Sequence, residues 1–321
     1  MSQAATKPRT IGRQQTITSL DNTSHPGRPG SDELVPSRYA LRIGEIDVLV
    51  ISDGVVTPPA ESMATNADPA VRGAWLDDMF LSRDAFDWAL NAVVVRSGGR
   101  TILIDSGLGV EVPEFPRAGH LLHRLEAAGI DLASVTDVVL THMHFDHVGG
   151  LLLDGVKDRL RPDLRIHVAA AEVKFWASPD FSRTGMPPAL RDVARRASKR
   201  FLEEYHSQLR PFEEEHEVAP GVVVTRTGGH TPGHSVVRLA SGGDRLMFAG
   251  DALFPVSFDH PEWHNGFEHD PEEAARVRVG LLRELAATGE WLVATHMPFP
   301  SVGRVAAAGD LFRWVPAWWD Y

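Results

Sequence analysis

Residues 141–150 read Thr-His-Met-His-Phe-Asp-His-Val-Gly-Gly, and this decapeptide constrains the fold and chemistry of the chain more than any other stretch. The apolar run Val138–Leu140 precedes it, which predicts a buried strand that ends in a loop. Imidazole nitrogens and carboxylate oxygens suit a borderline divalent ion such as zinc. The decapeptide therefore predicts a metal-binding loop, with ligands His142, His144, Asp146 and His147.

Three later segments also place a histidine or an aspartate directly after an apolar run. His230 follows a valine-rich run within Gly-His-Thr-Pro-Gly-His, Asp251 follows Leu-Met-Phe-Ala-Gly, and His296 follows Trp-Leu-Val-Ala-Thr. Taken singly, each is more simply explained as a capped turn residue. As an ordered set after the first loop, they predict the further ligands that the decapeptide cannot supply by itself.

In these positions the sequence resembles the metallo-β-lactamase-fold hydrolase superfamily, whose ligand pattern is His-x-His-x-Asp-His followed by His, Asp and His. The resemblance covers roughly residues 40–315. Residues 171–176, 295–300 and 314–316 are similar to the methyl parathion hydrolase branch, and residues 260–263 are of a kind found near both that branch and the acyl-homoserine lactonase branch. All seven ligand positions match: His142, His144, Asp146, His147, His230, Asp251 and His296.

The resemblance implies two divalent metal ions per chain, with zinc expected first and manganese, cobalt or iron as alternatives. His142, His144 and His230 are implied to hold one ion, Asp146, His147 and His296 the other, and Asp251 to bridge them. Asp146 is implied to act in catalysis by orienting the nucleophile or passing its proton. His234, four residues beyond His230, is expected to be structural.

An internal repeat predicts the architecture. Residues 94–105 and 237–251 both look like hairpins around a Ser-Gly-Gly turn, and both finish on an aspartate. The next strand also repeats, at 138–143 and 292–297. This repeat agrees with the fold that the resemblance implies: an α/β (α+β) protein, an αββα metallo-β-lactamase sandwich of two ββ-rich halves. In that fold, helices are expected on the outer faces and the metal cleft between the halves.

Asp105 ends the first repeat at the position that corresponds to Asp251. The resemblance implies that it lies behind the ligands and orients a ligand histidine or the ligand loop through a hydrogen bond. A turn-capping aspartate explains this residue equally well.

Several local patterns predict further elements. Residues 39–52 look like a first hairpin, and 118–129 and 187–205 have apolar residues at helical spacing. Asp270 followed by proline predicts a helix from 271 through 287. The acidic run 213–215 is expected to be a solvated surface loop.

Composition indicates a globular protein of 321 residues, with 43% hydrophobic and 23% charged residues. The net charge of −11 opposes binding to phosphate backbones, so no nucleic-acid partner is expected. Cysteine is absent, which excludes disulfides, thiolate ligands and a cysteine nucleophile. No apolar stretch approaches the ~18 residues that span a bilayer, and no secretory signal is evident, so a cytoplasmic protein without a membrane partner is expected.

The N-terminal residues 1–36 have few large apolar side chains and are expected to form a flexible tail. Residues 37–321 are expected to form a single metallo-β-lactamase-like domain. The family resemblance also implies a homodimer.

A region between the first hairpin and the repeat is dense in large apolar side chains. Such residues are more often core than pocket, but a lobe that closes over the cleft would bind an acyl, aryl or lactone group. The pocket candidates are Phe80, Phe86 and Trp88 in this region, which we call the aromatic insert, together with Trp176 after the metal-binding loop and His260 and Trp263 in the long loop after Asp251.

Three classes of function remain open. The first is a dinuclear-metal hydrolase of a lactone, ester or phosphotriester with an apolar group, a small-molecule substrate. The second is a thioester hydrolase, similar to glyoxalase II, or a β-lactam hydrolase. The third is an iron-dependent redox member of the same fold, or a binding protein; a binding protein is disfavoured because no ligand position is missing.

Overall fold

The computed structural model describes residues 36–109 and 115–318. The chain divides into the units Met1–Pro36 and Ser37–Tyr321, and every element below belongs to the second. The predicted flexible tail, residues 1–36, falls almost entirely outside the described residues and stays a prediction. Among the described residues, no helix has both the length and the apolar character that a membrane crossing requires.

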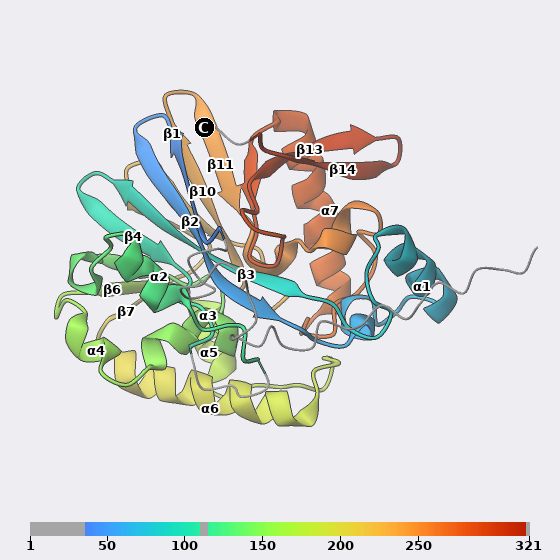
Figure 1. Ribbon diagram of the computed structural model, residues 1–321. Helices are drawn as coiled ribbons and strands as arrows, with labels where there is room; N and C mark the ends of the chain where they lie inside the picture. Colours follow the sequence, from blue (N-terminus) through green and yellow to red (C-terminus); the bar gives the residue numbers. More distant parts are fainter. Residues whose placement is uncertain (1–35, 110–114, 319–321) are drawn as a thin grey trace, which may run out of the picture. The chain divides into compact units, whose positions relative to one another are not determined.

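Two seven-stranded sheets form the centre of the second unit (Figure 1). Neighbouring strands in each sheet are consecutive in the sequence. The first sheet contains β1 (Arg38–Ile43), β2 (Ile46–Val56), β3 (Trp88–Ser97), β4 (Arg100–Ile104), β5 (Asp137–Val139), β6 (Arg165–Ala169) and β7 (Leu209–Phe212). The second contains β8 (Glu215–Ala219), β9 (Val222–Arg226), β10 (Ser235–Ser241), β11 (Asp244–Phe248), β12 (Trp291–Val293), β13 (Gly303–Ala308) and β14 (Leu311–Pro316).

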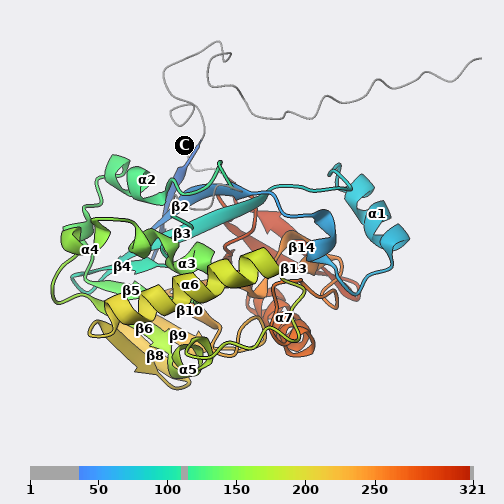
Figure 2. The same ribbon diagram turned by 90° about the horizontal axis from the view of Figure 1, so that it is seen from below.

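Seven helices accompany the sheets in the described part of the chain: α1 (Pro69–Asp78), α2 (Leu121–Ala127), α3 (Phe145–Val148), α4 (Val156–Arg159), α5 (Ala170–Trp176), α6 (Pro188–Tyr205) and α7 (Pro271–Thr288). Figures 1 and 2 show α2 to α6 beside the first sheet and α7 beside the second. These six helices, α2 to α7, therefore lie on the outer faces, as the sequence predicts.

The core has three layers of apolar contacts. One lies between the sheets and joins residues such as Val50 and Ile104 to Val224 and Phe248. A second packs the first sheet against α2 to α6, and a third packs the second sheet against α7. This confirms the predicted αββα sandwich.

The repeat corresponds to the two halves of the fold. In each half an antiparallel hairpin is followed by a strand that pairs in parallel with its second member, β5 on β4 and β12 on β11. The registers match, because Ile104 lies opposite Val139 and Phe248 lies opposite Val293. The carboxyl ends of parallel strands meet at one edge, so both halves deliver their Asp and His residues there.

Most predicted elements are confirmed with shifted ends. Helix α7 begins at Pro271, and the Asp270 side chain caps it by accepting a hydrogen bond from the Glu273 N–H at 3.1 Å. The helix predicted over 118–129 begins only at Leu121, because Gly119 adopts φ +85°. The acidic run 213–215 is a loop only in part, because Glu215 opens β8 and pairs with Thr225.

Candidate metal centre

Each metal-ligand candidate lies just beyond a strand end at the shared edge of the sandwich. His142 and His144 follow β5, Asp146 and His147 lie on the one-turn helix α3, and the other candidates follow β9, β11 and β12. All of these side chains are buried except Asp146, which is half-buried. Two groups of ligand atoms result: His142, His144, His230 and Asp251 in one, and Asp146, His147 and His296 in the other.

In the first group, the nitrogens of His142 and His144 that face each other carry no hydrogen, so no hydrogen bond joins them. Thr141 Oγ1 donates to Asp105 at 2.8 Å, so it accepts from His142 Nδ1 at 3.0 Å and leaves a lone pair on His142 Nε2. That nitrogen lies 2.9 Å from His144 Nδ1. His230 Nε2 lies 3.0 Å from the same His144 atom.

A second chain of contacts fixes the tautomer of His144. The backbone carbonyl of Asp180 can only accept, so His269 Nδ1, at 3.2 Å, carries a proton. His269 Nε2 then accepts from His144 Nε2 at 3.3 Å, which leaves the lone pair of His144 on Nδ1. Two lone pairs thus face each other at His142 and His144, an arrangement that a cation stabilises. The donor set fits a divalent metal ion.

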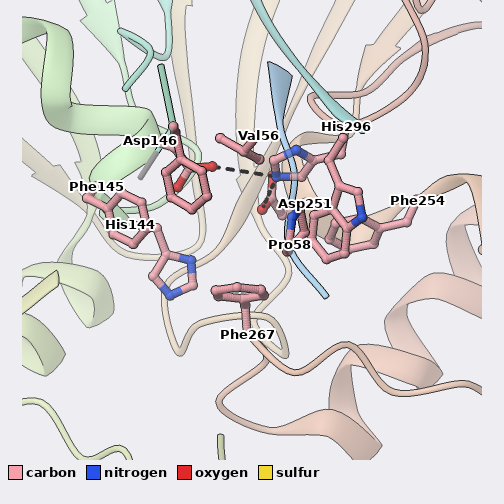
Figure 3. A pocket seen from close by; sticks show the side chains of 11 residues that line it. Val56, Pro58, His144, Phe145, Asp146, Asp251, Phe254, Phe267 and His296 are labelled. Atoms are coloured by element: carbon pink, nitrogen blue, oxygen red, sulfur yellow. Dashed lines mark hydrogen bonds and ion pairs between the residues drawn. The ribbon is translucent and has the colours of Figure 1, made fainter. Parts of the chain in front are cut away.

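The second group surrounds the carboxylate of Asp251. His296 Nε2 lies 3.0 Å from Asp251 Oδ2 and 3.6 Å from Asp146 Oδ2 (Figure 3). His147 Nε2 lies 3.3 Å from Asp251 Oδ1, and neither atom has a hydrogen-bond partner within the described residues. Asp251 Oδ2 also lies 3.3 Å from His230 Nε2, so this carboxylate contacts both groups.

The electrostatics of the site favour positive charge beside the carboxylates. Burial lowers the pKa of His142, His144 and His230 well below the usual value, so these three imidazoles are neutral. Burial opposes charge on His147 as well, but Asp251, Asp105 and Asp146 together raise its pKa well above the usual value. A neutral imidazole is the form in which histidine binds a metal ion, and the raised pKa of His147 reflects carboxylates that attract positive charge at this position.

Asp105 and His234 lie behind the ligands. Asp105 accepts from the Thr141 N–H and hydroxyl and from His147 Nδ1, each at 2.8 Å, so it orients a ligand histidine as well as capping the turn. His234 Nε2 accepts from the Asp251 N–H at 3.1 Å, while its Nδ1 lies 2.8 Å from Thr227 Oγ1. His234 belongs to neither ligand group among the described residues.

A narrow cavity opens onto both ligand groups. Its polar lining in the described chain consists of the ligands His144, Asp146, Asp251 and His296. The remaining lining is apolar: Val56, Pro58, Trp88, Phe115, Phe145, Phe254 and Phe267. Figure 3 shows Phe145, Phe254 and Phe267 on different sides of these ligands.

The structure brings only one predicted pocket residue, Trp88, to the cavity lining. Phe86 packs behind it, with ring centroids 6.4 Å apart. Trp176 is buried and contacts the ring of His144 edge-on, while His260 stacks on Trp263 at 3.8 Å. These four residues belong to the packing around the site.

The prediction that Phe80 lines the pocket is corrected by the structure, because Phe80 is not among the residues that line the cavity. Its side chain is 96% exposed, and its φ of +57° lies in the turn that ends α1. The aromatic insert docks instead through Trp75, whose indole N–H donates to Asp259 at 2.9 Å and whose ring meets Trp263 edge-on.

Sequence reasoning missed several residues of the site. Phe145 stands inside the decapeptide, and Phe254 and Phe267 stand in the long loop after Asp251, so proximity to ligands was an available signal for all three. Val56, Pro58 and Phe115 carry no local signal, because only the tertiary fold brings them to the cavity. His269 was missed for the same reason.

Comparisons with known proteins agree with this geometry. A family model described as the metallo-beta-lactamase superfamily matches residues 86–296. A curated relative, a probable metallo-hydrolase of Mycobacterium bovis, is 26% identical over 199 residues. That match covers 53% of this chain and 59% of the relative, so the chain spans less than two thirds of the relative's length.

Two solved structures match most of the chain. AidC, a dizinc quorum-quenching lactonase in complex with a product, has a TM-score of 0.81 and 26% sequence identity. The hydrolase AbOPH has a TM-score of 0.79 and 26% identity. Each match covers 89% of this chain and 99% of the other protein.

Proposed function

Because this chain belongs to the metallo-beta-lactamase superfamily, we propose that it is a metal-dependent hydrolase whose two ligand groups hold two divalent ions, zinc in the first instance. The observation that carries the proposal is the position of Asp251, whose carboxylate contacts histidines of both groups at the floor of one apolar cavity. Bound divalent ions supply Lewis acidity and lower the pKa of water toward neutrality.

The residues of the chain then have separate tasks. The imidazoles would hold and orient the ions, and Asp251 would serve both halves of the centre. Asp146 is the one half-buried ligand and lines the cavity, so its carboxylate is placed to orient the attacking water and to hold its proton. The surrounding aromatic side chains exclude bulk water from the reacting group.

The cavity supports a substrate with an apolar group beside a hydrolysable carbonyl or phosphoryl centre. Apart from the metal ligands, the described lining offers aromatic and aliphatic surface, which favours acyl, aryl or lactone groups. The similarity to AidC, itself a lactonase, favours a lactone or ester over the thioester and β-lactam alternatives. We propose a small-molecule substrate for this site and no nucleic-acid partner. A homodimer in the cytoplasm remains a prediction from the sequence.

A substrate panel tests the proposal. The purified protein is assayed with an acyl lactone, an aryl ester, a phosphotriester, a thioester and a β-lactam, before and after metal removal by a chelator. We expect the fastest turnover with the lactone or aryl ester, its loss on chelation and its return with zinc. Turnover that survives chelation, or a thioester or β-lactam as the preferred substrate, contradicts the proposal.

A further inference from the structure

We propose that Glu172, on α5, is a positioning residue that fastens both loops of the His142, His144 and His230 group and so supports that half of the metal centre selectively. This inference rests on the proposed metal centre. Glu172 is not one of the residues that line the cavity, and its hydrogen bonds go to the loops that carry the ligands and to Trp176.

The carboxylate of Glu172 reaches both loops at once. Its Oε1 accepts from the Met143 N–H at 2.9 Å, between His142 and His144. Its Oε2 accepts from the Thr231 hydroxyl at 2.7 Å and the Gly233 N–H at 2.8 Å, just beyond His230. A single side chain thus fixes the separation of two loops that are 29 and 61 residues away from it along the chain.

The hydrogen bonding requires a carboxylate. Trp176 Nε1 also donates to Oε1, at 2.6 Å, so each oxygen accepts two hydrogen bonds. Two of these donors are backbone N–H groups and one is an indole N–H, none of which can accept. Glutamine has the same shape, but its NH2 group must face at least one donor, which leaves a buried N–H unpaired.

The contact with Glu172 also explains why residue 233 is a glycine. A Cβ atom at position 233 would lie 2.3 Å from the backbone nitrogen of Glu172 and 2.5 Å from its Cβ. Only glycine lets the His230 loop approach α5 closely enough for Glu172 to accept from its backbone. The second glycine of Gly-His-Thr-Pro-Gly-His therefore serves the fastening of this loop.

Asp105 supports both groups. It accepts from His147 Nδ1 in the second group, and it fixes Thr141, whose hydroxyl contacts His142 Nδ1 in the first. Glu172, by contrast, contacts only the loops that carry the histidines of the first group. Replacing Asp105 by its amide is therefore expected to weaken both sites, whereas replacing Glu172 by its amide is expected to weaken the first.

The experiment measures zinc affinity in the full-length chain. Metal-free wild type and the Glu172→Gln and Asp105→Asn variants are titrated with zinc against a chromogenic chelator. Cobalt absorption spectra identify the emptied group by comparison with His230→Ala, for the first group, and His296→Ala, for the second. We expect Glu172→Gln to weaken one site about 10- to 100-fold and to give the His230→Ala spectrum, while Asp105→Asn weakens both sites.

Asp137→Asn is the matched control. Asp137 is also a fully buried carboxylate, and it accepts from His167 at 2.8 Å at the far end of β5, before the ligand loop. We expect this variant to lower the melting temperature while both zinc affinities stay at their wild-type values. Equal weakening of both sites in Glu172→Gln, or the His296→Ala spectrum, overturns the inference, because a general loss of structure has that signature.

If Glu172→Gln does not fold, Thr231→Val tests the role of Glu172 instead. The exchange is nearly isosteric and removes one donor to Oε2, so a smaller loss at the same site is expected, and unchanged affinity overturns the inference. The same experiment distinguishes failure of this inference from failure of the proposed function. A wild-type chain that takes up no metal contradicts both. If wild type binds zinc but Glu172→Gln does not weaken the first site selectively, only this inference is contradicted.

Discussion

Asp251 is the residue at which the two ligand groups converge, and His234 holds its backbone from behind. Asp251→Ala removes the shared carboxylate, so we expect loss of both metal ions and at least a 100-fold drop in activity, on the order of the largest losses for supporting residues. His234→Ala should keep the metal content of the wild type, because His234 contributes no ligand atom. Elemental analysis of the two variants checks this. If His234→Ala empties a site and His230→Ala does not, the assignment of the ligand within Gly-His-Thr-Pro-Gly-His is wrong.

Phe267 lines the cavity, whereas Phe80 is exposed and is not part of the lining. Phe267→Ala removes apolar surface that contacts the substrate, which costs about 1–2 kcal/mol for a bulky group. We expect KM for aryl or long-chain substrates to rise roughly 5- to 30-fold, with little change for short substrates and none in metal content. Phe80→Ala is the matched control and should leave all of these values unchanged. An equal effect on short and long substrates means that Phe267 is a packing residue.

The candidate ligands were predictable as an ordered set, whereas the pocket residues were not. Together the seven candidates carry a signal, because histidine and aspartate directly after apolar strands are uncommon in such density. Aromatic side chains lack that signal, since the same residue types also build the core. Trp176 and Trp263 illustrate this, because both are large, near the motifs and buried in packing.

At the scale of elements, the predictable parts were those with strong periodicity or repetition. The two hairpins and the parallel strand after each were visible as an internal repeat, and α6 and α7 were visible from helical spacing and capping. Ends were less predictable, because Gly119 delays α2 through its backbone conformation and Glu215 joins β8 through pairing with Thr225. The docking of the aromatic insert depends on Asp259, some 184 residues from Trp75.

Asp53 accepts from the Leu108 N–H, shortly after β4, at 2.8 Å and from the Leu121 N–H, at the start of α2, at 2.6 Å. Burial raises the pKa of Asp53 from 3.8 to about 6, although these hydrogen bonds oppose the rise. The folded chain therefore holds an extra proton here between about pH 4 and 6, so this group's contribution to stability is present in full below pH 4 and is lost as pH rises through 6.

Asp53→Asn removes that titration. In metal-free protein, we expect the unfolding free energy of wild type, relative to the variant, to increase by up to about 3 kcal/mol as pH falls from 7 to 4. Chemical denaturation across this range, with both proteins at each pH, measures the difference. A difference that does not vary with pH contradicts the assigned pKa.

At the scale of the whole molecule, the sandwich places ligands from both halves at one edge, and neither half holds a complete centre by itself. His142, His144, Asp146 and His147 come from the first half, and His230, Asp251 and His296 come from the second. This division is why the repeat in the sequence predicted the location of the site. Substrate choice depends on the cavity wall, whose residues come from segments with no common pattern.

Elemental analysis of the purified full-length chain tests the central claim most directly. The account predicts close to two divalent metal ions per chain, because two adjacent ligand groups share Asp251. One iron per chain without a second ion contradicts the two-ion hydrolase.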